Sequence, residues 1–442
     1  MIFARPFFYL LTFFFPPPIR SDYTVPNEAL QGDAMRITMI MIFIAFSCTL
    51  LSELLSESAP HPLKEEWITI FVHGTIGLRA NLAVSTLIHL LQNDINNTLY
   101  KNTVEIIRDD PIFYQNQPIG KPGLCEIDMN MHVPGYAAGL CAQLYNFTAE
   151  NVKPPETNHY YTFGWSGLIS PLERYNAACD LYKALSQLLQ EYAYKNITPK
   201  IRLLCYSHGG NTGLNIALAR AKEFPQDTFY IDELILLGTP VQKETDYLVC
   251  HTLFKKIYHI YSRYDRIQRL DFFSFQRFFS QRRFATCTRY TLPEKLTQIE
   301  IQCFTPARYS FSQKKIVNRS PGHSELWFFG WPEHRHSSYR KYFPLYPIPI
   351  VCLLPAIIAA VEAKMPQEKH VILELNPHSA QTFLRKRHIF KKYKINCFSK
   401  SLLNRLKIHA ESYKPLDYTR DLHQQHIDSA IMLASKRLNM TL

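Results

Sequence analysis

Glycine is scarce in this chain, with 15 among 442 residues, so each short glycine-containing sequence stands out. None of the ten cysteines forms a C-x-x-C pair, and the nearest approach to a metal-ligand pattern is His334-x-His336 beside Glu333, which is weak. No G-x-x-x-x-G-K-[ST] sequence occurs, and no G-x-G-x-x-G follows a strand-like run. We therefore expect neither a metal nor a nucleotide cofactor.

The chain also lacks internal repeats and low-complexity arrays. Hydrophobic residues make up 47% of it, enough to bury a substantial core. Local composition predicts an apolar leader over residues 1–60, one large domain over 61–362 and a basic C-terminal extension over 363–442.

The most informative segment is Leu203-Leu204-Cys205-Tyr206-Ser207-His208-Gly209-Gly210, an apolar strand that meets a serine and two glycines. This pattern is typical of a nucleophile elbow, in which a strained strand-to-helix turn exposes the serine hydroxyl. The backbone N–H of His208 then faces the developing oxyanion. Cys205 stands where G-x-S-x-G has its first glycine, so its sulfur must fit against the returning helix; we expect it to be a buried small residue.

Strand-like runs over 66–72, 160–163 and 234–237 lie on both sides of this serine. Helix-like runs over 174–192 and 217–222 lie between them and the strand that ends at the serine. Strands that alternate with helices predict an α/β fold with a mostly parallel sheet flanked by helices. The first strand ends in His73-Gly74-Thr75, and Thr75 is our candidate for a second backbone N–H donor to an oxyanion.

In order, the segments F-V-H-G-T, F-G-W-S-G, Y-S-H-G-G and L-L-G-T-P resemble the lipase and putative serine esterase branch of the α/β-hydrolase family, over about residues 64–362. The resemblance implies the α/β-hydrolase fold and a Ser, Asp or Glu, His triad in that chain order. It places the acid after the strand that follows L-L-G-T-P. Asp265 is our candidate there, and Asp271 is the nearest competitor.

The triad histidine should lie on a loop after the last strand. His323, in Gly322-His323-Ser324-Glu325-Leu326, resembles the family's G-H-x-x-L, while His334 and His336 lie close behind as open alternatives. A competing serine is Ser166, in Trp165-Ser166-Gly167, but no glycine pair opens a helix after it. We interpret Ser166 as part of the pocket rim or as a packing residue.

Two further segments extend the domain. Residues 108–157, rich in Pro, Asn and Tyr, predict a lid or substrate-binding insertion, with a surface decoration as the alternative. Residues 345–361 are apolar and contain prolines, which favours a buried last helix over a membrane span.

The leader contains two apolar runs. The second begins at Met35-Arg36 and runs from Ile37 to Leu51, in the manner of a secretory signal, so Met35 is a candidate true start. A single uncleaved membrane anchor is the alternative. We expect an exported or membrane-associated protein, and a cytoplasmic one if the leader does not function.

Beyond residue 363 the composition becomes basic, with fifteen Lys and Arg against six Asp and Glu from 364 to 442. The densest part is residues 385–394, where apolar side chains are interleaved with the charges. Such a helical extension can bind an anionic membrane surface, or it can be only a solvated face. Nucleic acid is the less favoured partner.

Taken with the resemblance, these residues predict a carboxylic ester hydrolase that acts on lipid-like esters through an acyl-enzyme on Ser207. Two alternatives remain open: a hydrolase-fold binding protein that has lost catalysis, suggested by Cys205, and an acyltransferase with the same triad.

Overall fold

The computed structural model describes residues 39–42, 44, 65–76, 95–152, 157–269, 280–309, 313–318, 320–331 and 345–441. The chain divides into two compact units, Met1–Leu63 and Lys64–Leu442. In the first unit only residues 39–42 and 44 are described, and they are helical. The predictions for Met35 and for cleavage of the leader lie outside the described residues. Across the described parts of the chain, no helix has the length and apolar character to cross a bilayer.

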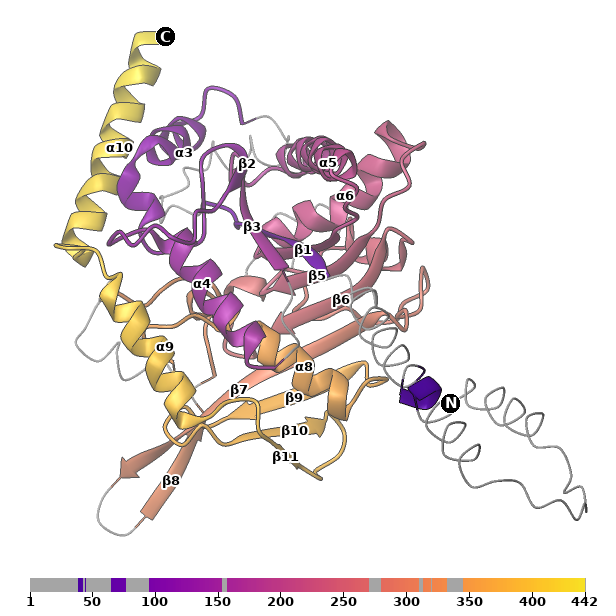
Figure 1. Ribbon diagram of the computed structural model, residues 1–442. Coiled ribbons are helices and arrows are strands. Elements are labelled where there is room, and N and C mark those ends of the chain that lie inside the picture. The colour runs from indigo at the N-terminus through magenta and orange to yellow at the C-terminus, as the bar shows by residue number, and fades with distance from the viewer. Residues whose placement is uncertain are drawn as a thin grey trace, which may run out of the picture. The chain divides into compact units, whose positions relative to one another are not determined.

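A single sheet organises the second unit (Figure 1). Its strands are β1 (Glu66–Val72), β2 (Gly123–Glu126), β3 (Thr157–Gly164), β4 (Lys200–Tyr206), β5 (Ile231–Leu237), β6 (Phe254–Tyr261), β7 (Leu296–Tyr309), β8 (Gln313–Asn318), β9 (His370–Leu375), β10 (Thr382–Lys386) and β11 (Tyr393–Ile395). The order across the sheet is β11-β10-β9-β7-β6-β5-β4-β1-β3-β2, and β8 pairs with the far end of β7.

The strands from β3 through β1, β4, β5, β6 and β7 to β9 are all parallel to their neighbours. Antiparallel strands finish both edges, β2 on one side and β10 with β11 on the other. The predicted α/β architecture, with a mostly parallel sheet flanked by helices, is therefore confirmed.

Helices cover both faces of the sheet (Figure 1). The α-helices among the described residues of this unit are α3 (Leu99–Asp109), α4 (Ala137–Glu150), α5 (Pro171–Tyr194), α6 (Gly209–Glu223), α8 (Leu354–Lys364), α9 (Lys400–Ser412) and α10 (Arg420–Thr441). Short 3-10 helices are η1 (Pro111–Tyr114), η2 (Asp246–Cys250), η3 (Ile267–Arg269), η4 (Ser324–Leu326) and η5 (Ile350–Leu353).

Alternate residues of each central strand face two separate cores. In β4, Leu204 and Tyr206 join the core under α4, α8 and α9, whereas Leu203 and Cys205 join the core under α5 and α6. A strand buried on both faces has no polar side to show, which explains the nearly continuous apolar runs in the sequence. The apolar stretch at 345–361 forms η5 and α8, and both are buried in the core under α4, α8 and α9.

The stretch 108–157, predicted as a lid or a surface decoration, contains η1, β2 and α4. Leu140, Cys141 and Leu144 of α4 are fully or almost fully buried in the core under α4, α8 and α9, which we call the main core. Residues 137–150 are therefore part of the folded core and not a decoration on it. A lid role stays a prediction for the rest of the stretch.

The C-terminal segment differs from the helical extension predicted for 363–442. β9 pairs in parallel with β7, and β10 and β11 continue the sheet, so the sheet crosses the expected domain boundary. Leu402, Leu403 and Leu406 of α9 pack in the main core, and α10 lies against α3. The segment is basic, but short apolar runs within it complete the domain, and only α9 and α10 match the helical prediction.

This arrangement predicts how the chain responds to truncation. A chain that ends at Lys364 loses β9 and α9, which leaves β7 as an open edge and exposes one core, so we expect no cooperative unfolding transition. A chain that ends at Thr419 loses only α10 and should keep a cooperative transition whose midpoint is a few degrees lower. Circular dichroism during heating measures both. Cooperative unfolding of the chain ending at Lys364 would show that the C-terminal segment is separable.

Candidate active site

The site begins where β4 ends and α6 starts. Ser207 occupies this turn with φ of 52°, in the left-handed region that side chains rarely adopt. The turn also brings neighbouring backbone so close that side chains would not fit there. A Cβ on Gly74 would lie 2.7 Å from the Ser207 Cβ, and one on Gly209 would collide with the carbonyl oxygen of His73. Glycine at these two positions lets the end of β1 and the start of α6 approach the serine.

Cys205 takes the place of the first motif glycine, and α6 accommodates it. A Cβ on Gly213 would lie 2.7 Å from the Cys205 Sγ, so glycine on the facing helix provides the room that the sulfur needs. Cys205 is fully buried, and burial raises the pKa of its thiol well above the ordinary value. It is thus a neutral packing residue, as we expected from the sequence.

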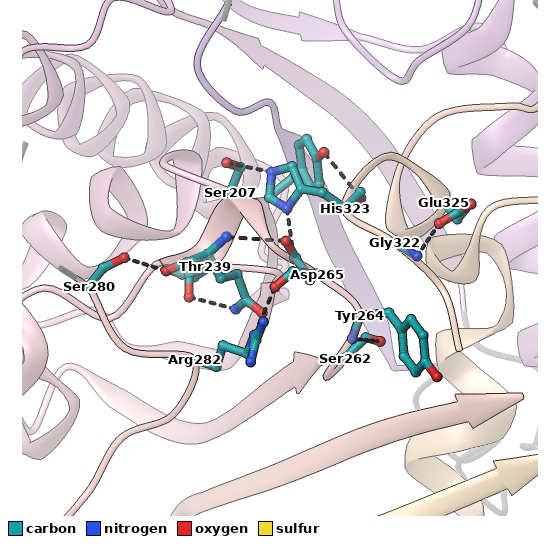
Figure 2. Close-up of polar contacts among 12 residues, drawn as sticks. Ser207, Thr239, Ser262, Tyr264, Asp265, Ser280, Arg282, Gly322, His323 and Glu325 are labelled. Atoms are coloured by element: carbon teal, nitrogen blue, oxygen red, sulfur yellow. Dashed lines mark hydrogen bonds and ion pairs between the residues drawn. The ribbon is translucent and has the colours of Figure 1, made fainter. Parts of the chain in front are cut away.

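Ser207, His323 and Asp265 form one chain of hydrogen bonds (Figure 2). His323 Nε2 lies 2.9 Å from Ser207 Oγ, and His323 Nδ1 lies 2.7 Å from Asp265 Oδ2. Because a carboxylate only accepts, Nδ1 carries a proton, which leaves Nε2 of the neutral ring to accept from the serine hydroxyl. The three residues that the sequence predicted separately are therefore in contact.

The carboxylate of Asp265 has no exposed surface and accepts a hydrogen bond at each of its two oxygens, from the Gln268 backbone and from His323. The backbone N–H of Gln268 donates to Oδ1 at 3.1 Å, while Arg282 Nε donates to the Asp265 carbonyl oxygen at 2.8 Å. These bonds leave Oδ2 directed at the histidine (Figure 2). Asp271, the competing acid, lies outside the described residues.

The histidine loop differs from expectation in its position along the chain. We expected the loop after the last strand, but His323 follows the β7–β8 hairpin, and β9 of the main sheet comes later. Tyr206 supports the loop, since its ring lies 4.8 Å from that of His323 and its hydroxyl donates to the His323 carbonyl oxygen at 3.2 Å. His334 and His336 lie outside the described residues.

His73 orients the predicted oxyanion loop. Its Nδ1–H donates to the Gly74 carbonyl oxygen at 2.7 Å, and its Nε2 accepts from the Trp165 N–H at 3.1 Å. In a trans peptide the C=O and the next N–H point in opposite directions, so a fixed Gly74 carbonyl also fixes the Thr75 N–H. Burial lowers the pKa of His73 to about 3, with a further contribution from the charge of Arg108. The ring is therefore neutral at ordinary pH and keeps this pair of bonds.

Thr75 has a feature that the sequence did not suggest. Its Oγ1 is buried and has no hydrogen-bond partner among the described residues. An unpaired buried hydroxyl costs about 1–3 kcal/mol, which calls for a physical reason. The other predicted donor, the backbone of His208, follows Ser207 directly and precedes the first turn of α6.

Ser166 does not contact the triad. Its hydroxyl donates to Glu173 Oε2 at 3.0 Å, at the start of α5. This local bond agrees with a packing role.

Glu325 is a residue of the site that we did not single out from the sequence. Its carboxylate accepts the backbone N–H of Gly322, next to His323, and so closes the turn that holds the histidine (Figure 2). Burial raises the pKa of Glu325 from 4.5 to about 7, and the nearby charge of Asp265 adds to the shift. The signal available in the sequence was an acid two positions after the candidate histidine.

Among the residues that the structure describes, no group of three His, Cys, Asp or Glu side chains could hold a metal ion. No family model and no curated protein matches the chain.

Glu325 makes stability depend on pH. Because its pKa is higher in the folded protein, folding favours the protonated form, and stability is lost as pH rises from about 4.5 through 7, by up to about 3 kcal/mol. Glu325→Gln keeps an acceptor for the Gly322 N–H but cannot ionise. We expect the variant to lose less stability than the parent over this range, as measured by urea unfolding at several pH values. Parallel pH dependences would contradict this role.

Proposed function

We propose that this protein is a serine hydrolase that cleaves carboxylic esters through an acyl-enzyme on Ser207. The single observation that carries the proposal is the hydrogen-bond chain from Ser207 through His323 to Asp265. The resemblance of four ordered segments to the lipase and serine esterase branch of the α/β-hydrolase family supports it, as does the parallel sheet with the serine at the end of a central strand.

The geometry suits two successive acyl transfers. Ser207 Oγ attacks the ester carbonyl carbon while its proton passes to His323 Nε2, and Asp265 stabilises the resulting imidazolium. When the bond to the leaving oxygen breaks, Nε2 returns the proton to the departing alkoxide. A water molecule then gives a proton to the same nitrogen as its oxygen attacks the acyl carbon. The bond from that carbon to Ser207 Oγ breaks, the acid leaves, and Nε2 returns the proton to Oγ.

The negative charge that develops on the carbonyl oxygen needs donors on the side away from the histidine. The backbone N–H groups of Thr75 and His208 fill this role, since Gly74 touches the serine and His208 follows it. The Thr75 hydroxyl provides a third donor. Its lack of a partner among the described residues has a reason if the substrate's oxyanion is that partner.

Lipid-like esters remain the favoured substrates because of the apolar and aromatic composition of the chain. The intact hydrogen-bond chain makes a binding protein without catalysis the weaker alternative. An acyltransferase would use the same residues, and no observation in the structure favours it over hydrolysis.

Active-site labelling tests the proposal directly. Ser207→Ala should abolish reaction with a fluorophosphonate probe and lower ester turnover on the order of a millionfold, and His323→Ala should lose nearly as much. Ser166→Ala is the matched control and should label normally. Mass spectrometry of the labelled peptide identifies the residue. Labelling that persists in Ser207→Ala, or that maps to Ser166, would overturn the assignment; activity retained in His323→Ala would point to His334 or His336.

The Thr75 hydroxyl is tested by a pair of substitutions. Thr75→Val keeps the shape and the backbone N–H but removes the hydroxyl, so we expect kcat to fall about tenfold to a hundredfold with little change in KM. Thr75→Ser keeps the hydroxyl and should retain most of the rate. Equal rates for the two variants would show that the hydroxyl does not contact the oxyanion.

A further inference from the structure

The turn between β10 and β11 exposes apolar side chains. We call residues 382–395, which comprise both strands and the turn, the basic hairpin. Phe390 is 96% exposed, Ile389 48% and Tyr393 41%. Single exposed apolar residues are common on protein surfaces, but a phenylalanine ring wholly in water beside two further apolar residues is a marked feature.

Cations surround this apolar tip. The sequence from 385 to 394 contains six Lys and Arg and no Asp or Glu. Two carboxylates from outside the hairpin pair with some of these cations. Glu374 of β9 pairs with Arg385 and Lys392, and Glu368 pairs with Lys386. Lys386 and Lys392 are nearly half exposed in these pairs, so the positive charge of the hairpin faces water.

The strand register places the tip relative to Ser207. β9 runs parallel to β4 through the intervening strands, and β10 runs antiparallel to β9, with Lys386 opposite Val371 at the start of β9. The turn after Lys386 therefore lies at the amino-terminal edge of the sheet. Ser207 follows the carboxyl end of β4, a strand of seven residues that spans about 23 Å at roughly 3.3 Å per residue.

We propose that the basic hairpin docks the protein on an anionic phospholipid surface, with Phe390 and Ile389 among the headgroups and the lysines on lipid phosphates. Charge complementarity favours an acidic partner, and the exposed aliphatic and aromatic pair favours one with an apolar layer beneath its charges. A nucleic acid would satisfy the charges but offers no apolar layer for Ile389. The proposal is independent of the proposed catalysis.

The docked orientation has a consequence for the site. With the hairpin on the membrane, Ser207 lies at the opposite edge of the sheet, roughly 20 Å or more from the lipid surface. The site would then face away from the bilayer that the hairpin contacts. Anchoring and turnover of a soluble ester should therefore be separable.

The test uses the full chain and sedimentation with vesicles of phosphatidylcholine, with or without phosphatidylserine. We expect binding that requires phosphatidylserine and weakens with added salt, because exposed charges are screened within about 8 Å at physiological ionic strength. Phe390→Ser should weaken binding about tenfold or more, as expected when one buried aromatic side chain is removed. Leu416→Ser is the matched control, since Leu416 is 85% exposed outside the hairpin, and it should bind as the parent does.

All variants carry the same apolar leader, so the comparison isolates the hairpin. Thermal unfolding checks that each variant is folded, which keeps the test valid even if no ester is hydrolysed. Equal binding by Phe390→Ser and Leu416→Ser would overturn the proposal, as would equal binding to both vesicle compositions. Tighter binding to a DNA duplex, unchanged by Phe390→Ser, would also overturn it and identify a nucleic-acid surface.

Discussion

The close approach of β1 to the turn at Ser207 is the constraint on which the site depends. Parallel pairing sets Val72 beside Cys205, so the two strands end together. The backbone at Gly74 then touches the serine, where only a hydrogen atom fits in place of a side chain. A larger residue there would separate the loop at Gly74 and Thr75 from Ser207. The parallel register of the sheet therefore aligns the loop at Gly74 with the turn at Ser207.

The same parallel register brings Asp265 and His323 to the edge of the sheet where Ser207 lies. β6 is parallel to β5 and β4, so the chain after Tyr261 emerges at the edge where Ser207 lies and brings Asp265 there. β7 runs on beyond the sheet and returns as β8, which delivers His323 to the same edge. Parallel strands place their carboxyl ends together, and a site assembled from distant segments follows from that geometry.

Much of this site could be predicted because its three central residues, Ser207, Asp265 and His323, lie in short local sequence patterns. Ser207 follows an apolar strand and precedes His208 and two glycines, and Asp265 and His323 come after it in the chain order that the family resemblance implies. The roles of His73 and Glu325 could not be predicted in the same way. His73 acts through both ring nitrogens on backbone groups of different segments, and Glu325 acts on an N–H three residues away. Neither contact leaves a pattern in the sequence until the loops are placed.

The C-terminal strands were missed for a related reason. β10 and β11 have five and three residues, and their basic side chains obscure the alternation that marks a strand. The pairing of β9 with β7 joins segments far apart in the chain, and no local signal predicts that partner. Charge dominated the composition, so the segment resembled an appendage although its apolar residues complete the core.

Charged side chains are buried at one edge of the sheet and partly exposed at the other. At the carboxyl edge, Asp265 is fully buried, and its carboxylate accepts hydrogen bonds from Gln268 and His323. Loss of either bond would leave a buried polar group without a partner, at a cost in free energy. At the amino edge, Lys386 pairs with Glu368 while both are partly in water, and such a pair contributes little and exchanges partners readily. A lipid phosphate could replace the Glu368 carboxylate without moving the strands between. A surface that binds at one edge would thus leave the geometry around Ser207 unchanged.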